Sequence, residues 1–179
     1  MNDILWAPWR LAYIVEDDET REKSRVEAAA MHVEVAADGD AGCFLCQAVA
    51  DTQNRRRHVI DRTGHTIAVL NKFPYNNGHL LIAPKRHVGR LDLLSPEEQA
   101  ALTERIAFWV ARLEATMKPE GFNIGLNLGH AAGAGLPGHL HWHIVPRWNG
   151  DTNYMASIAS TKVIPQALEA LWETITAVR

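Results

Sequence analysis

One stretch of the sequence, HLHWHIV over residues 139–145, places a histidine at every second position of an apolar run. Side chains alternate between the two faces of a β-strand, so the three imidazoles would share one face while Leu140, Trp142 and Ile144 would point into the opposite layer. Three histidines in register beside a glycine-rich loop are more than core packing requires. The stretch therefore predicts a strand with one apolar face and a functional site on the other.

The segments before this strand predict further elements of a sheet. Thr66–Leu70 and His79–Ala83 predict a hairpin, because the turn sequence Pro74–Gly78 lies between two apolar runs. The sequence SPEE at residues 95–98 predicts the start of a long helix, since its serine, proline and second glutamate occupy capping positions. An apolar stripe at helical spacing follows, and it comprises Leu102, Ile106, Trp109, Val110, Leu113 and Met117.

The second half of the chain completes an α+β fold. Phe122–Leu128 predicts a strand, and Gly129–Gly138 connects it to the histidine strand Leu140–Val145. Pro165–Val178 predicts a closing helix, whose apolar side comprises Leu168, Leu171, Trp172 and Ile175. Together the elements predict an antiparallel sheet with one long crossing helix and a C-terminal helix.

The composition predicts a single globular domain over residues 1–179. The chain is 47% hydrophobic and 22% charged, with a formal net charge of −3, values that are ordinary for a compact domain. No apolar run approaches the roughly 18 residues that a membrane span needs, and Met1–Trp9 lacks the features of a secretory signal. We therefore expect a cytoplasmic protein that uses neither a membrane nor a nucleic acid polymer as its partner.

The predicted domain has three parts. Residues 1–42 form an arm and an insertion: Ile4–Tyr13 is an aromatic segment, and Glu16–Asp40 is acidic and then alanine-rich. Residues 43–148 form the core, and residues 149–179 form a C-terminal extension.

Cys43 and Cys46, the only two cysteines, have the Cys-x-x-Cys spacing of half a metal site. Tetrahedral zinc would need two more ligands. Alternate residues on a strand are too widely spaced for all three histidines of residues 139–143 to bind one ion, so we expect them to divide their roles. His139 and the distant His87 are our choice to complete a structural zinc site. A pair of idle buried thiols remains the alternative.

The loop sequence GAGLPG at residues 133–138 matches the residue pattern of a dinucleotide-binding fingerprint. That fingerprint requires a strand before it and a helix after it, whereas a strand follows here. A glycine-rich turn can still present backbone N–H groups to a phosphate. A flexible hairpin loop is the alternative interpretation.

With these residues assembled, the chain resembles the histidine triad (HIT) family, whose signature is His-φ-His-φ-His-φ-φ with φ apolar. Residues 139–145 match every position. The resemblance runs from about Cys43 to Trp148 and includes Asn71, the segment NGHLLIAPK at residues 77–85, and Asn127. The segments LWAPWR at residues 5–10 and PRWNGDTNYM at residues 146–155 are similar to the bacterial branch related to diadenosine tetraphosphate phosphorylases.

The resemblance implies a homodimeric HIT-like fold that binds a nucleotide or dinucleoside polyphosphate and cleaves at the α-phosphate through a covalent nucleotidyl-histidine. Carried over by position, His141 is the nucleophile, and His143 and His79 orient the phosphate site. Asn71 contacts the ribose, Asn127 lies near the scissile phosphate, and the loop amides at Gly133, Gly135 and Gly138 stabilise phosphate charge.

The resemblance also implies a zinc ion on Cys43, Cys46, His87 and His139, and no organic cofactor. Many relatives carry a serine or threonine hydroxyl in the loop before the triad, whereas residues 134–137 of this chain offer none. Hydrolysis and phosphorolysis therefore both stay open. Two other functions are compatible with the residues: a zinc hydrolase in which His139 and His141 hold a catalytic metal, and a nucleotide-binding signalling module without turnover.

Overall fold

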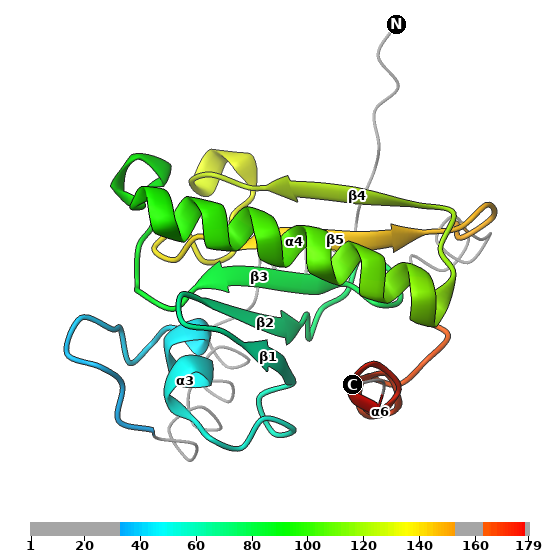
Figure 1. Cartoon of the computed structure of the whole chain (residues 1–179), viewed down its shortest axis with the longest axis horizontal. Coiled ribbons are helices and arrows are strands. Elements are labelled where there is room, and N and C mark those ends of the chain that lie inside the picture. Colours follow the sequence, from blue (N-terminus) through cyan, green and yellow to red (C-terminus); the bar gives the residue numbers. More distant parts are fainter. Residues whose placement is uncertain (1–32, 153–162, 178–179) are drawn as a thin grey trace, which may run out of the picture. The chain divides into compact units, whose positions relative to one another are not determined.

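The computed structural model describes residues 33–152 and 163–177 of the chain. Five strands in this part form one antiparallel sheet of order β1-β2-β3-β5-β4, with helices packed on it (Figure 1). The elements are α3 (Phe44–Ala50), β1 (Val59–Arg62), β2 (Thr66–Leu70), β3 (Leu80–Pro84), η1 (Leu91–Leu93), α4 (Pro96–Met117), β4 (Gly121–Leu126), η2 (His130–Ala132), β5 (Trp142–Arg147) and α6 (Leu168–Ala177). The α+β prediction is confirmed.

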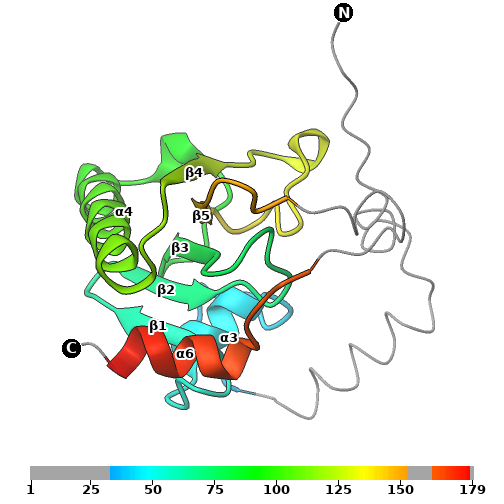
Figure 2. The same cartoon turned by 90° about the vertical axis from the view of Figure 1, so that its right-hand side faces the viewer.

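The predicted hairpin is the centre of the sheet. Strands β2 and β3 pair in one continuous register from Thr66 opposite Pro84 to Leu70 opposite Leu80. Every residue of both strands is buried, because the sheet is covered on both faces. Figure 2 shows α4 on one side of the sheet and α3 on the other.

Two apolar clusters fill these two interfaces. The larger cluster lies under α4 and α6 and includes Leu80, Ile82, Leu140 and Ile144. The smaller cluster lies under α3 and includes Ile67, Val69 and Leu81 with both cysteines. Successive side chains of β3 therefore enter different cores, as the alternation along a strand requires.

The histidine strand starts later than predicted. The expected strand Leu140–Val145 is replaced by β5 at Trp142–Arg147, so His139 and His141 lie before the ladder. The amide of Leu140 donates to the carbonyl of Val88 at 2.7 Å. Because Val88 lies beyond the end of β3, this bond is not part of the sheet ladder. The predicted alternation holds nevertheless, because Leu140, Trp142 and Ile144 all pack in the larger cluster.

Helix α4 begins and packs as its sequence predicts. The Ser95 hydroxyl accepts from the Glu98 amide at 3.2 Å, and the Glu98 carboxylate accepts from the Ser95 amide at 2.9 Å. Each bond satisfies an amide that the first helical turn leaves without a partner. Its apolar stripe packs as predicted, with Leu102, Trp109 and Leu113 buried in the larger cluster.

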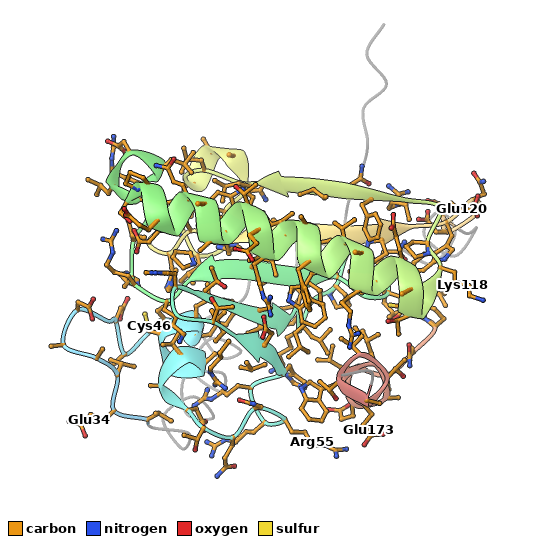
Figure 3. The ribbon with its side chains drawn as sticks, in the orientation of Figure 1. Glu34, Cys46, Arg55, Lys118, Glu120 and Glu173 are labelled. Carbon is orange, nitrogen blue, oxygen red and sulfur yellow. The ribbon has the colours of Figure 1, made fainter. Side chains whose placement is uncertain are left out.

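Two element boundaries differ from the sequence predictions. The strand expected at Phe122–Leu128 is Gly121–Leu126, since the chain turns away towards Gly129, whose φ is +81°. The helix expected at Pro165–Val178 begins at Leu168, and its buried side carries the predicted Leu171 and Ile175. The Trp172 indole donates to the Val59 carbonyl at 2.9 Å, and Glu173 pairs with Arg55 (Figure 3). The predicted C-terminal helix is therefore fixed against β1.

Several sequence predictions concern residues outside the described ranges. The aromatic arm Ile4–Tyr13 and most of the insertion Glu16–Asp40 fall there. Of the described residues, 33–151 and 164–177 belong to one compact unit. No helix in the described ranges combines the length and the apolar character that crossing a membrane demands.

The capping box of α4 provides a test of the fold. Ser95→Ala removes the acceptor for the Glu98 amide, so we expect the free energy of unfolding to fall by about 1 kcal/mol. Thr103→Ala, at an exposed position of the same helix, should leave stability unchanged or raise it slightly. Urea denaturation followed by circular dichroism measures both variants. Equal stabilities for the two variants would contradict the assigned cap.

Candidate active site and metal cluster

The structure separates the three histidines of residues 139–143 into two groups. The His139 ring points towards the cysteines of α3, whereas the rings of His141 and His143 lie together with their centroids 5.3 Å apart. His79 joins this second pair through a 2.8 Å contact with His143. The three rings are therefore divided between two groups of side chains, and their separate roles stay a prediction.

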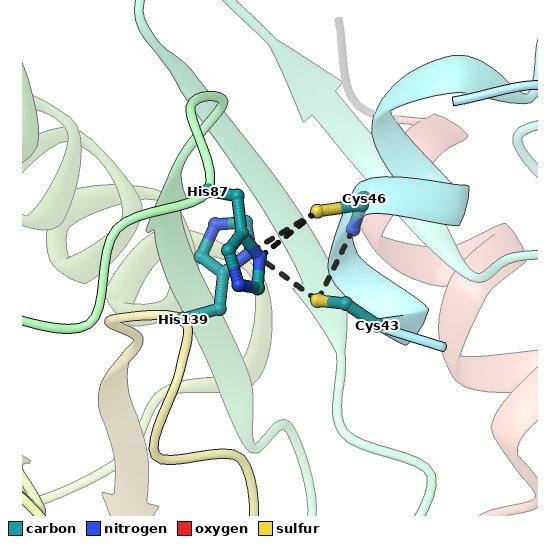
Figure 4. A group of neighbouring side chains, drawn as sticks. All are labelled: Cys43, Cys46, His87 and His139. Atoms are coloured by element: carbon teal, nitrogen blue, oxygen red, sulfur yellow. Dashed lines mark hydrogen bonds between the residues drawn. The ribbon is translucent and has the colours of Figure 1, made fainter. Parts of the chain in front are cut away.

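Cys43, Cys46, His87 and His139 converge into one cluster (Figure 4). One ligand atom from each residue lies within 4.8 Å of all the others. The Cys43 sulfur is 3.3 Å from His139 Nδ1, and the Cys46 sulfur is 3.2 Å from His87 Nδ1. These separations are close to the roughly 3.3–3.8 Å between neighbouring ligands of tetrahedral zinc.

Local structure places each donor of the cluster. Cys43 is the N-cap residue of α3, and its sulfur accepts from the Cys46 amide. His139 Nε2 donates to the Pro84 carbonyl at 2.8 Å, which leaves the Nδ1 lone pair facing the thiols. Gly138 packs beside His87, where an added Cβ would be 3.3 Å from its Nε2. A side chain at residue 138 would therefore crowd this ligand.

Burial keeps Cys43 and His139 uncharged when no metal is bound. Burial raises the pKa of the Cys43 thiol to about 12 and lowers the pKa of His139 to about 4. The imidazole is consequently neutral, as a metal ligand must be, and a thiolate in this environment needs a positive partner. Four closely spaced Cys and His donors with an oriented second shell fit a metal ion of the zinc type.

His141 is held as a neutral imidazole with one nitrogen available. Its Nδ1–H donates to the backbone carbonyl of His139 at 2.8 Å, so the Nε2 nitrogen carries the lone pair. The side chain is only 6% exposed, and burial lowers the pKa of His141. A neutral imidazole with a fixed tautomer is the form required of a nucleophile or a base.

His143 has the opposite tautomer. The Tyr75 amide donates to His79 Nδ1 at 3.0 Å, so the proton of neutral His79 lies on Nε2. This Nε2–H donates to His143 Nδ1 at 2.8 Å, and the proton of neutral His143 must then lie on its own Nε2. A bare nitrogen on His141 thus lies beside a ring that can donate a hydrogen bond.

The residues expected to bind the nucleotide differ in how closely they approach the histidines. The Asn71 side chain lies 3.3 Å from His79 Nδ1 and also accepts from the Phe73 amide. Asn127 donates to the Gly133 carbonyl at 3.5 Å. The Gly133 amide donates to His130 within the loop, and thus already has a partner; Gly135 and Gly138 are exposed.

Sequence reasoning missed two sets of residues around the site. A pocket of about 220 Å³ adjoins Asn71 and His79, and its other side comes from Ile164, Gln166, Leu168 and Leu171. Gln166 accepts from Asn77, which joins the C-terminal segment to the loop before β3. Tyr75 contacts the rings of His79 and His143. Tyr75 could have been found from its position four residues before His79. No local pattern in the sequence indicated that residues 164–171 line the pocket.

Comparison with known proteins agrees with this arrangement. Residues 52–150 match the HIT domain. The chain belongs to the histidine triad family. An AP-4-A phosphorylase from Mycobacterium tuberculosis is 37% identical over 165 residues, which are 92% of this chain and 77% of the relative. An adenosine 5'-monophosphoramidase from Schizosaccharomyces pombe is 29% identical over 63% of this chain and 81% of its own length.

A solved histidine triad structure supports the fold. The Zn-bound histidine triad family protein from Mycobacterium smegmatis superposes with a TM-score of 0.62 at 26% identity, covering 78% of this chain and 94% of that one. The family, the α+β fold and a cluster able to hold a metal are thus established for this chain.

Metal binding by the cluster can be tested through one ligand. His87→Ala removes a donor, so we expect the metal dissociation constant to rise by more than about 100-fold and thermal stability to fall. The exposed His65 provides a matched control, and His65→Ala should bind metal like the wild type. Elemental analysis and competition with a chromogenic chelator measure both. Undiminished metal affinity in His87→Ala would remove His87 from the ligand set.

Proposed function

We propose that this protein is a nucleotidyl hydrolase or transferase that cleaves a dinucleoside polyphosphate or nucleotide conjugate at its α-phosphate. The observation that carries the proposal is the hydrogen bond from His141 Nδ1 to the His139 carbonyl. It makes Nε2 of a buried neutral imidazole the available nucleophile, beside a His143 ring whose Nε2 carries a proton.

The proposed reaction has two displacements. His141 Nε2 attacks the α-phosphorus, so that an N–P bond forms while the bond to the leaving group breaks and its electrons depart with that group. The broken bond is P–O in a dinucleoside polyphosphate and P–N in a phosphoramidate. The acceptor, which is water or inorganic phosphate, then attacks the same phosphorus while the N–P bond breaks. The electron pair of that bond returns to Nε2 and restores the neutral imidazole, and the proton of a water acceptor passes to solvent. His143 Nε2–H would donate to a non-bridging oxygen as negative charge develops there. Asn71 and Asn127 would bind the ribose and phosphate.

Relatives support this substrate class. The Mycobacterium tuberculosis relative is named for phosphorolysis of AP-4-A and matches 92% of this chain, which favours a dinucleoside tetraphosphate. The Schizosaccharomyces pombe relative is named for cleavage of an adenosine phosphoramidate, which supports nucleotide conjugates as the alternative substrate. Both reactions would use the same nucleophile, and they differ in leaving group and acceptor.

We also propose that the cluster on Cys43, Cys46, His87 and His139 holds zinc in a structural role. Four protein donors leave a tetrahedral ion no open position for water. His141 is not among these donors, which argues against the alternative of a catalytic zinc on His139 and His141. When bound, zinc would fix α3 to the segments after β3 and before β5. Thiolate ligands suit a reducing compartment, which supports a cytoplasmic location.

A homodimer is the third part of the proposal. Strand β4 is an edge of the sheet, and edge strands present unpaired backbone groups. Ile124 lies opposite Ile144 in β5, on the face that α4 covers, and is 47% exposed. Phe108 of α4 is 42% exposed. Exposed apolar side chains on an open edge strand and on α4 are suited to contact with a second copy of the chain.

The nucleophile is tested by His141→Asn. The asparagine amide can replace Nδ1–H as donor to the His139 carbonyl but offers no nucleophile, so we expect kcat to fall by about 10³-fold or more. Melting temperature and metal content should stay close to those of the wild type. His65→Asn serves as the matched control. An active His141→Asn variant would contradict the covalent mechanism, and a lost metal would favour the catalytic-zinc alternative.

Chromatography of the products identifies the acceptor. With diadenosine tetraphosphate as substrate, ADP formed only in the presence of inorganic phosphate indicates phosphorolysis. AMP and ATP formed with or without phosphate indicate hydrolysis. Tight nucleotide binding without turnover of this substrate or of adenosine phosphoramidate would instead support the signalling module.

The dimer is tested by light scattering during size-exclusion chromatography. Ile124→Asp places a charge on the exposed edge strand β4, so we expect the wild type at twice the chain mass and the variant at the mass of one chain. Glu104→Asp, at an exposed position of α4, is the control and should remain dimeric. A monomeric wild type would contradict the proposal.

A further inference from the structure

Tyr75 has two independent contacts with the histidines of the site. Its backbone amide donates to His79 Nδ1 at 3.0 Å. Its ring stacks on His143 with centroids 5.6 Å apart and planes inclined by 22°, and lies 4.8 Å from the His79 ring. The function proposed above assigns no part to this residue.

The amide contact determines which nitrogen of each ring is protonated. His79 is only 1% exposed and receives the Tyr75 amide on Nδ1, so its own proton occupies Nε2 and points at His143. A flipped His79 ring would lose this bond and the bond to His143 together. The Tyr75 amide, together with the Asn71 side-chain amide 3.3 Å from the same nitrogen, therefore sets, through His79, the Nε2–H tautomer of His143.

The ring contact determines how His143 is oriented. The Tyr75 ring covers one face of the imidazole, while the His141 ring meets it edge-on at an angle of 65°. Stacked aromatic rings have a preferred geometry, so this packing restricts rotation of His143 about its side-chain bonds. The Nε2–H of His143 is thereby kept in one direction relative to His141.

The loop that carries Tyr75 is anchored to the strand that carries His143. The buried Asn76 side chain donates to the Pro146 carbonyl at 3.0 Å and to Asp151 at 2.8 Å. Gly78 has a φ of +75°, and an added Cβ there would be 2.8 Å from the Met117 sulfur. These constraints hold the loop close to α4 and the end of β5, so Tyr75 keeps a fixed place over the pair.

We propose that Tyr75 is a positioning residue, whose amide and ring together hold His143 in the tautomer and orientation needed to donate to the α-phosphate. The inference rests on the proposed roles of His141 and His143. Tyr75 acts through these rings rather than on the substrate. Within its side chain, the aromatic ring and not the hydroxyl is required.

Steady-state kinetics of three variants test this role. Tyr75→Leu keeps apolar bulk but removes the ring, so we expect kcat to fall by about tenfold or more with KM changed by less than about twofold, since small misplacements of catalytic groups are costly. Tyr75→Phe keeps the ring and should stay within about threefold of wild-type kcat. Phe73→Leu, an equivalent change at a 61% exposed position of the same loop, should leave kcat unchanged.

Long-range ¹H–¹⁵N spectra of the histidine rings give a readout that needs no substrate. We expect His79 and His143 to be Nε2–H tautomers in the wild type, in Tyr75→Phe and in Tyr75→Leu, because each of them keeps the residue 75 amide that donates to His79 Nδ1. Tyr75→Met is made alongside as a second ringless variant in case Tyr75→Leu does not fold. Single His→Gln variants assign the signals.

Three results would overturn the proposal: full activity without the ring, equal losses in Tyr75→Phe and Tyr75→Leu, or a wild-type His143 protonated on Nδ1. The spectra also separate this inference from the proposed function. An inactive wild type with the expected tautomers would contradict the substrate assignment. An active wild type with His143 protonated on Nδ1 would contradict the role of Tyr75.

Discussion

The alternation of side chains along residues 139–144 is the constraint on which the site depends. Leu140, Trp142 and Ile144 pack under α4, and this apolar packing forces the intervening histidines to the other face of the chain. A shift of one residue would place imidazoles in the core and apolar side chains in the site. The same burial that stabilises the sheet therefore fixes the register of the proposed chemistry.

His139 connects the two halves of this site. Its ring belongs to the cluster with the cysteines, while its carbonyl accepts the Nδ1–H of His141. A metal on the cluster would immobilise the backbone that sets the His141 tautomer, without taking part in the proposed reaction. A structural ion can in this way influence catalysis through one peptide unit.

The loop between β2 and β3 supplies the other half of the arrangement. It brings Asn71, Tyr75 and His79 to the end of the central hairpin, where β3 pairs with β5 and places Leu81 opposite His143. His79 and His143 are 64 residues apart in sequence, yet this antiparallel pairing makes them hydrogen-bonding partners. The sheet order, rather than any single motif, assembles the donor and acceptor nitrogens.

Periodicity, turn residues and capping signals in the sequence determined the hairpin, the long helix, its buried stripe and the division of the histidines, because these depend on neighbours within a few residues. The sequence did not predict α3, the late start of β5, or the contact of residues 164–171 with the site. Those features depend on partners distant in the chain: Leu140 bonds to Val88 beyond β3, and α6 is held by Val59. The tautomers of His79 and His143 were likewise decided only by tertiary structure, since a proton's place on a ring follows from the groups that surround it in space.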